Sequence, residues 1–123
     1  MSFFADKNQQ KGGLTRIFNT LIFSRDGLVA AWKEAAFRQL VFLHIPLIFL
    51  ALIFVSKDNG KLLLITVSFL SLVVELVNTG IEAVVDRISL ERHPLSKIAK
   101  DCGSAAQLLM LILCAVLWVL VCL

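Results

Sequence analysis

The sequence has little of what builds a disulfide-bonded, metal-stapled or nucleic-acid-binding domain. Its three cysteines, Cys102, Cys114 and Cys122, are odd in number and lack metal-ligand spacing, so neither a disulfide framework nor a zinc site is indicated. The first 20 residues hold no continuous apolar core, and we therefore expect no secretory signal there. A net charge of +3 is too small to indicate nucleic acid as a partner.

Charge itself is scarce, and apolar residues take its place. Only 17% of the 123 residues are charged, 59% are hydrophobic, and the mean hydropathy is +0.87. An ordinary soluble domain is roughly 45–50% apolar. A chain this short cannot bury so much apolar surface in a core of its own, so lipid or sister subunits must cover much of it. The composition therefore predicts one small membrane-embedded unit.

Three stretches with little or no charge predict an all-α protein with three transmembrane helices, at 39–56, 62–85 and 102–123. At 1.5 Å per residue the first extends about 27 Å, close to the ~30 Å hydrocarbon core of a bilayer. Residues 57–61 contain an Asn-Gly pair and predict a short turn. Residues 86–101 predict a longer polar link.

Residues 1–38 differ from the rest and predict an amphipathic surface region. Apolar residues recur at helical spacing from Leu14 to Ile22, and a second amphipathic run follows from Leu28 to Ala35. The polar segment from Ser24 to Gly27 predicts a break between the two runs. Basic amphipathic helices with an aromatic anchor such as Trp32 lie in the membrane interface. The alternative is a helix packed on a soluble partner.

The distribution of basic residues predicts the orientation of the chain. Six basic residues precede the first span, two lie in the short turn, and four lie in the longer link. Because Lys and Arg concentrate on the cytoplasmic side, we expect the N-terminus and the longer link there. The short turn and the C-terminus should then be external.

One stripe of polar residues stands out within the second span. Glu75, Asn78, Glu82 and Asp86 are spaced so that all four lie on one narrow face of a helix. Ionisable groups within a bilayer are expensive and mark function by default. Anions in this position need a cation, protons or basic partners. The gradient of the stripe places Glu75 in the inner leaflet and the later residues near the cytoplasmic boundary.

Basic residues of the longer link complement this stripe. Lys97 and Lys100 precede the third span, and Glu34 can approach from the same side. Carboxylates and lysines at one interface suit a nucleotide with a divalent metal, because Mg²⁺ takes one or two carboxylates plus phosphate oxygens. Since Gly12-Gly13 is too little for a Walker-type phosphate loop, any nucleotide site here is unconventional.

Three sequence blocks resemble the prokaryotic diacylglycerol kinases. These are VELVNTGIEAVVDRI at 74–88, HPLSKIAKDCGSAA at 93–106, and AAWKEAAFRQ at 30–39. The last two look more like the lipid-recycling kinases of Gram-negative bacteria than the undecaprenol kinases of Gram-positive ones. The resemblance covers about 15–118. It implies a helix-exchanged homotrimer in the inner membrane that transfers the γ-phosphoryl group of ATP to the hydroxyl of diacylglycerol, giving phosphatidic acid.

The resemblance also implies roles for individual residues. Glu75 would be the general base and Asn78 would position the reacting groups. Glu34 and Glu82 would hold Mg²⁺. The nucleotide would contact Arg16, Phe23, Glu34, Glu82, Glu91, Arg92, His93, Lys100 and Asp101. The lipid would contact Arg16, Trp32, Ala36, Phe37, Arg38, Gln39, Glu75, Ser104 and Trp118.

The chain departs from the family pattern at a few positions. The segment between Trp32 and Glu34 is one residue shorter than in the best-known members. Phe23 stands where a tyrosine is often seen near the nucleotide, Asn19 where a basic residue is common, and Leu40 where an acidic residue is common.

Taken without the resemblance, the residues leave other functions open. An ion- or proton-coupled carrier would use Glu75 and Glu82 as a relay and would consume no ATP. A non-catalytic membrane adaptor would tolerate Glu75→Gln. Within the kinase family, undecaprenol is the alternative substrate to diacylglycerol.

Overall fold

The computed structural model describes residues 12–123, and this part of the chain is all-α, as predicted. It contains α2 (Gly13–Trp32), α3 (Ala35–Phe54), α4 (Asp58–Ile88) and α5 (Pro94–Cys122). The last three are long and apolar enough to cross a membrane, which confirms the three expected spans. Both α3 and α4 begin four residues before the apolar stretch that predicted them, and α5 begins eight residues before. The C-terminal ends of the three helices differ from the predicted ends by one to three residues.

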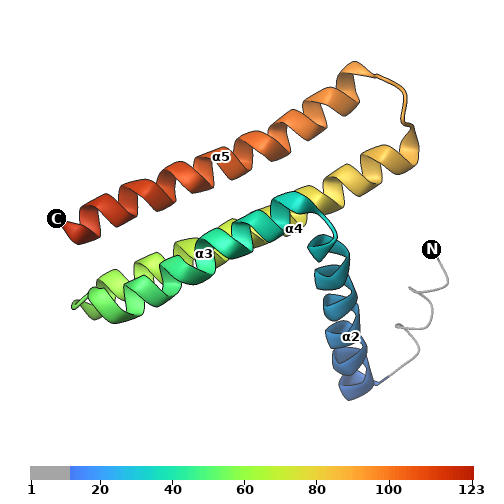
Figure 1. Ribbon diagram of the computed structural model, residues 1–123. Helices are drawn as coiled ribbons and strands as arrows, with labels where there is room; N and C mark the ends of the chain where they lie inside the picture. Colours follow the sequence, from blue (N-terminus) through green and yellow to red (C-terminus); the bar gives the residue numbers. More distant parts are fainter. Residues whose placement is uncertain (1–11) are drawn as a thin grey trace.

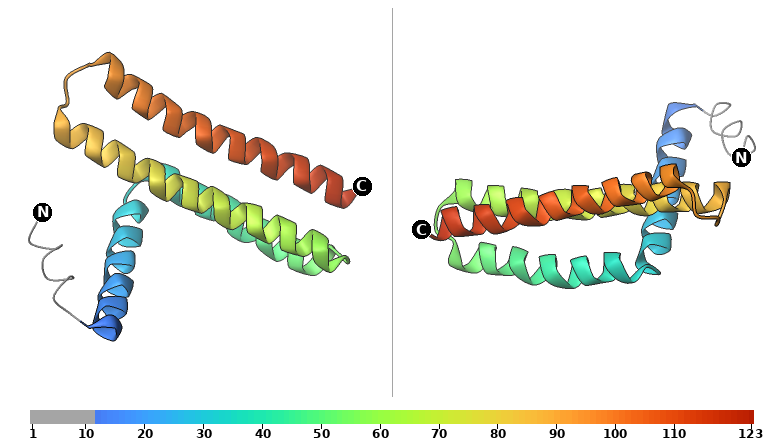
Figure 2. Two further views of the ribbon diagram at one scale, coloured as in Figure 1. Left: turned by 180° about the vertical axis from the view of Figure 1, so that it is seen from behind. Right: turned by 90° about the horizontal axis from the view of Figure 1, so that it is seen from above.

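The central helix of the arrangement is α4. It packs against α5 on one side and α3 on the other, while α2 makes only limited contacts with α3 and α4. Figure 1 shows α2 leaving the other three helices at a steep angle. The chain ends, at the C-terminus of α5, beside the link between α3 and α4, and both views of Figure 2 show the same arrangement.

The helices differ in length, and this sets the shape of one end of the molecule. The 20 residues of α3 correspond to about 30 Å, the thickness of the hydrocarbon core, whereas the 31 residues of α4 correspond to about 46 Å. The excess length of α4 and its partner α5 projects past the corner between α2 and α3 (Figure 1). One end of the α4–α5 pair therefore extends beyond a membrane that α3 just crosses.

The short turn lies earlier than the Asn-Gly signal predicted. Asn59 and Gly60 belong to the first turn of α4, and the non-helical residues are 55–57. Gly60 is in the helix because of packing: a Cβ at this position would lie 2.9 Å from a methyl carbon of Val121 and 3.2 Å from one of Val55. The glycine allows α4 and α5 to approach closely at this end.

The predicted break in the N-terminal region is wrong, because α2 is one continuous helix through Ser24 and Gly27. The Ser24 hydroxyl donates to the carbonyl oxygen of Thr20 at 2.9 Å, and Thr20 donates likewise to Arg16. These polar side chains bond within the helix instead of ending it. Almost all of α2 is exposed, with Ala31 its only buried residue.

The polar link before the third span is also shorter than predicted. Only residues 89–93 are non-helical, and the charged residues on either side belong to α4 and α5. Pro94 occupies the first turn of α5, where a missing backbone N–H costs nothing. The His93 imidazole Nδ1 accepts from the backbone N–H of Leu95 at 3.1 Å and caps the helix.

Candidate functional site

A polar groove of about 330 Å³ lies where the beginning of α3 meets α4 and α5. Six of the residues singled out from the sequence line it together. These are Glu34, Ala36, Glu75, Asn78, Glu82 and Ser104. Thr79, Gln107, Leu108 and Leu111 complete the lining. The helical stripe predicted on α4 therefore faces a real concavity and gathers residues from three helices.

The stripe runs from buried to exposed along α4. Glu75 is 5% exposed and Asn78 is 7% exposed, Glu82 is half-buried, and Asp86 is exposed. This gradient follows from the fold, because α3 covers only the earlier part of α4. The most deeply placed carboxylate is thus the one predicted to act as the base.

The position of the groove can be read from the register of α3 on α4. His44 contacts Ser68 and Ser71, and the two helices are antiparallel. Following α3 back from His44 to its start brings Ala35 to about the level of Asn78 on α4, since both helices rise 1.5 Å per residue. The groove therefore lies at the N-terminal end of α3, a helix whose length matches the hydrocarbon core of a bilayer.

A glycine on α5 makes room for the Asn78 side chain. A Cβ at Gly103 would lie only 1.8 Å from Asn78 Oδ1, closer than any real contact. No donor among the described residues bonds this Oδ1, which is buried. Within the segment between Lys100 and Ala106, the lack of a side chain at Gly103 therefore leaves room for Asn78 of α4.

None of the three glutamates of the groove is in a salt bridge within residues 12–123. The salt bridges of residues 12–123 join Lys61 to Asp58, Lys97 to Asp101, and Lys100 to Asp86. No group of three His, Cys, Asp or Glu side chains in this part of the chain is close enough to form a complete metal site. Two carboxylates with phosphate oxygens are nevertheless what Mg²⁺ commonly takes, so the donor set of the groove fits this ion.

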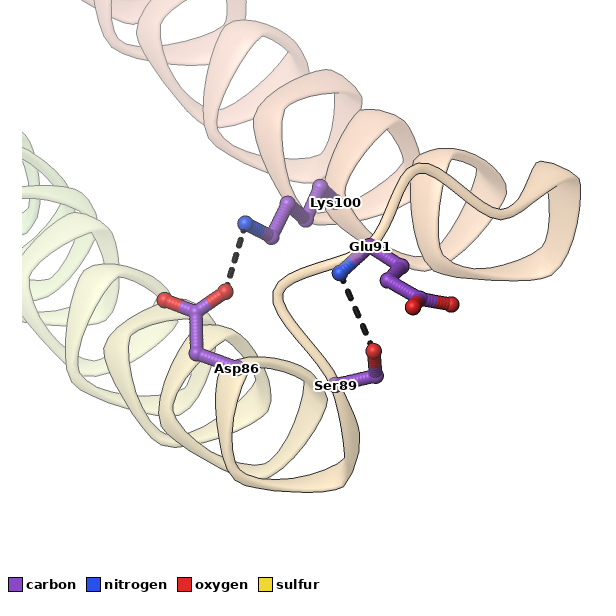
Figure 3. Close-up of polar contacts among 4 residues, drawn as sticks. All are labelled: Asp86, Ser89, Glu91 and Lys100. Carbon is purple, nitrogen blue, oxygen red and sulfur yellow. Dashed lines mark hydrogen bonds and ion pairs between the residues drawn. The ribbon is translucent and has the colours of Figure 1, made fainter.

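A second, larger cavity of about 680 Å³ lies between the projecting ends of α4 and α5. The predicted nucleotide residues Glu91, Arg92, His93, Lys100 and Asp101 line it, together with Asp86. Lys100 Nζ reaches Asp86 Oδ1 at 2.7 Å and joins the two helices, and the Ser89 hydroxyl accepts from the Glu91 backbone N–H at 3.0 Å (Figure 3). Arg92, His93, Lys97 and Lys100 are the basic residues of its lining, and Asp86, Glu91 and Asp101 are the acidic ones.

The remaining predicted residues lie away from both cavities within a single chain. Arg16 and Phe23 belong to α2, and Gln39 is an exposed residue of α3. Arg38 Nη1 donates to the carbonyl oxygens of Trp32 and Lys33, both at 2.8 Å.

The aromatic residues predicted for the lipid site are also dispersed. Trp32 and Phe37 pack edge to face with ring centroids 6.5 Å apart and line a hollow of about 540 Å³ at the α2–α3 corner. Trp118 lies 14 residues beyond Ser104, about 21 Å further along α5. Its buried Nε1–H has no partner among the described residues.

Gln107 and His44 are not among the site residues predicted from the sequence. His44 is fully buried, with Nδ1 at 3.2 Å from Ser68 Oγ and Nε2 at 2.9 Å from Ser71 Oγ, and Gln107 Nε2 donates to the same Ser71 at 2.6 Å. A signal was present: Ser68 and Ser71 continue the α4 stripe, and Gln107 is the only amide among residues 105–123.

Comparison with known proteins agrees with the family resemblance of the sequence blocks whose residues line these cavities. The family model described as "Prokaryotic diacylglycerol kinase" matches residues 22–122. The chain is 52% identical over 107 residues to a diacylglycerol kinase of Pseudomonas aeruginosa, covering 86% of this chain and 87% of the relative.

More distant relatives match over a similar length. A diacylglycerol kinase of Helicobacter pylori is 49% identical over 108 residues, covering 86% of this chain and 84% of the relative. One of Escherichia coli is 43% identical over 107 residues, covering 86% and 88%. The match includes α3, α4, α5 and the second half of α2. On this evidence the chain belongs to the prokaryotic diacylglycerol kinase family.

Proposed function

We propose that this protein transfers the γ-phosphoryl group of ATP to the free hydroxyl of 1,2-diacylglycerol and so produces phosphatidic acid. The observation that carries the proposal is the position of the groove. A buried glutamate lies at the membrane boundary of α3, next to a cavity that is lined by both basic and acidic side chains and projects beyond it. A lipid that stays in the bilayer and a nucleotide that stays in water can meet only at such a boundary.

Glu75 takes the role of general base in this proposal. Its carboxylate lines the groove, is 5% exposed, and has no ion-pair partner within residues 12–123. It can therefore accept the proton of the lipid hydroxyl as the oxygen attacks phosphorus. Asn78, one turn along the same stripe, helps to position the reacting groups. Catalysis is then mainly positioning and charge neutralisation.

Glu34 and Glu82 would hold Mg²⁺ in the same groove. Glu34 comes from the junction before α3 and Glu82 from α4, so the fold brings them to one concavity from distant parts of the sequence. When bound, the ion would neutralise phosphate oxygens and so make the γ-phosphorus a better electrophile. The two carboxylates bind and orient it.

The charged cavity would hold the nucleotide. Arg92, His93 and Lys100 line its walls, and the ion pair of Lys100 with Asp86 is half-exposed on both sides. An exposed pair of this kind contributes only about 0–1 kcal/mol, so a phosphate group can replace Asp86 as the partner of Lys100 at little cost. Arg16 and Phe23 would complete nucleotide binding from α2.

The lipid would approach the groove along the apolar sides of the helices. Ala36 and Ser104 line the groove, and Trp32, Phe37 and Arg38 lie at the nearby α2–α3 corner. Gln39 and Trp118 would contact the same lipid further out. The steep angle of α2 to the other helices suits a helix that lies on the membrane surface.

We further propose an inner-membrane homotrimer with a cytoplasmic N-terminus. The basic residues of the first 38 positions and of 86–101 support this orientation. The apolar faces of α3, α4 and α5 are largely unburied within one chain, which leaves surface for sister subunits as well as for lipid.

The polyprenol and carrier alternatives have less support. The relatives described above carry the name diacylglycerol kinase at 43–52% identity. A carrier also needs polar groups through the whole bilayer, whereas the polar stripe of α4 ends at Ser68 and residues 62–67 contain only one polar residue, the exposed Thr66.

The experiment is a transfer assay on the purified full-length protein in detergent, with Mg²⁺, ATP labelled at the γ position, and dioctanoylglycerol. We expect label in the lipid fraction as phosphatidic acid, with much less transfer to undecaprenol under the same conditions. Label that remains in ATP and inorganic phosphate, in a sample with the helical content of the folded protein, would overturn the proposal.

A further inference from the structure

A chain of buried polar side chains crosses the three spans beneath the groove. His44 on α3, Ser68 and Ser71 on α4, and Gln107 on α5 are all buried, with Gln107 the most exposed at 8%. Burying such groups among apolar helices is costly unless they bond one another. Here Ser71 is the common member, in contact with both His44 and Gln107.

The hydrogen bonds give this chain a direction. Ser71 Oγ accepts from Gln107 Nε2 at 2.6 Å, so its own proton is available to His44 Nε2, which is 2.9 Å away. A neutral imidazole then carries its proton on Nδ1, which faces Ser68 Oγ at 3.2 Å. With Nε2 of Gln107 bound in this way, the amide has one end fixed.

The other end of the Gln107 amide has nothing to bond. Its Oε1 is buried and has no donor among the described residues, although the side chain lines the groove. A buried carbonyl oxygen without a donor costs about 1–3 kcal/mol, so a bound donor there is favourable. Diacylglycerol offers a single hydrogen-bond donor, which is the hydroxyl that is to be phosphorylated.

Gln107 is also at the correct depth to meet this hydroxyl. Gly103, one turn earlier on α5, lies against Asn78, and Gln107 reaches Ser71. Glu75 lies between Ser71 and Asn78 on the same stripe of α4, and it lines the groove with Gln107. The amide and the carboxylate therefore face the groove at neighbouring levels.

We propose that Gln107 binds the hydroxyl of the lipid acceptor through Oε1 before the proton passes to Glu75, and that Ser71 and His44 are positioning residues that hold the amide in this orientation. The inference rests on the proposed function. It assigns recognition of the alcohol group to α5, and it gives the polar chain of the membrane interior a role beyond packing.

Two ligands test this recognition directly. One is dioctanoylglycerol, and the other is its 3-deoxy analogue, the same diester with hydrogen in place of the hydroxyl. Binding of each is measured on the full-length protein in detergent without ATP, by displacement of a fluorescent diacylglycerol. Gln107→Leu should weaken binding of dioctanoylglycerol about 5- to 10-fold, the usual worth of one hydrogen bond, and leave binding of the deoxy analogue unchanged.

The positioning residues have their own variants. Ser71→Ala should weaken binding of the hydroxyl ligand by a smaller factor, again without affecting the deoxy analogue. In turnover, KM for the lipid should rise while KM for ATP stays the same. Thr66→Val is the matched control: it removes a hydroxyl from an exposed position of α4 and should change neither ligand.

The possible results distinguish failure of the proposed role of Gln107 from failure of the proposed function. Equal weakening of both ligands in Gln107→Leu would mean a purely structural role and would overturn the inference. Unchanged binding of both ligands would overturn it as well. Wild-type protein that phosphorylates dioctanoylglycerol in either case leaves the proposed function intact, whereas inactive wild-type protein refutes the function itself.

Discussion

The groove and the charged cavity are neighbours on α4, yet they treat their carboxylates in opposite ways. In the charged cavity Asp86 and Asp101 are paired with lysines and exposed to solvent. In the groove Glu75 and Glu82 lie in no ion pair of the described residues, and Glu75 is nearly buried. Uncompensated charge at low exposure is expensive, so the proposed catalytic groove should lower the stability of the protein.

The same difference suits each region to a different ligand of the proposed reaction. Paired, exposed charges suit exchange with the phosphates of a soluble nucleotide. Unpaired carboxylates beside apolar walls suit a metal, a proton and a lipid hydroxyl. Substitutions in the groove should therefore affect catalysis strongly, and substitutions in the charged cavity should affect nucleotide binding modestly.

The largest expected effect is that of removing the Glu75 charge. Glu75→Gln keeps the shape of the side chain but cannot take a proton, so kcat for lipid phosphorylation should fall about 10²- to 10⁴-fold. ATP binding should be unaffected, because the charged cavity is unchanged. Glu91→Gln, which neutralises a carboxylate that lines the other cavity, serves as the comparison and should keep kcat within a few-fold. Comparable losses in kcat for both variants would contradict the expected difference between the groove and the charged cavity.

Loss of a proposed metal ligand should come next. Glu82→Gln should raise the Mg²⁺ concentration needed for half-maximal activity by about tenfold or more, because the ion loses a charged ligand. Glu34→Gln should act in the same direction. Activity at saturating Mg²⁺ should recover in part. A Mg²⁺ titration that overlays that of the wild type would remove these residues from the metal site.

Substitution of two glycines by alanine compares a packed helix surface with an open one. Gly103→Ala places a Cβ on Asn78, so we expect a loss of about 1–3 kcal/mol in stability together with a loss of activity. Gly80→Ala meets open space and should stabilise α4 by up to about 1 kcal/mol. Thermal unfolding of the two variants in the same detergent measures the difference. A Gly103→Ala protein as stable and active as the wild type would contradict the close fit.

The smallest effects are expected among the lysines. Lys100→Met removes the link between α5 and α4 and should raise KM for ATP several-fold, with a change in stability below about 1 kcal/mol. Lys97→Met removes a pair within α5 and should change KM for ATP less. Steady-state kinetics with varied ATP measure both. A larger KM effect for Lys97 would show that the projecting cavity binds the nucleotide in another way.

Much of the fold followed from patterns that need no tertiary information. The apolar stretches predicted the three long helices, and the spacing of Glu75, Asn78 and Glu82 predicted a shared face, because helical periodicity is a local property. The turn at Asn59-Gly60 was misplaced, since Gly60 is needed for contact with Val121, which is distant in sequence.

The parts of the site that escaped prediction depend on contacts between helices. Helical spacing places Ser71 on the stripe but cannot reveal that Gln107 and His44 both reach it. The close contact of Gly103 with Asn78 is likewise visible only when α5 packs on α4. The charged residues within 94–101 predict a polar link by composition, whereas the cap at His93 starts a helix there.

In the proposed reaction, lipid and nucleotide meet at the groove from opposite sides of a membrane boundary. Photolabelling tests it most directly, with one diacylglycerol that carries a diazirine beside the hydroxyl and another that carries it at the end of an acyl chain, followed by mass spectrometry of the peptides. We expect the hydroxyl-end probe to label α4 near Glu75 and α5 near Gln107, and azido-ATP to label 86–101. Labelling of the 55–57 link by the hydroxyl-end probe would contradict it.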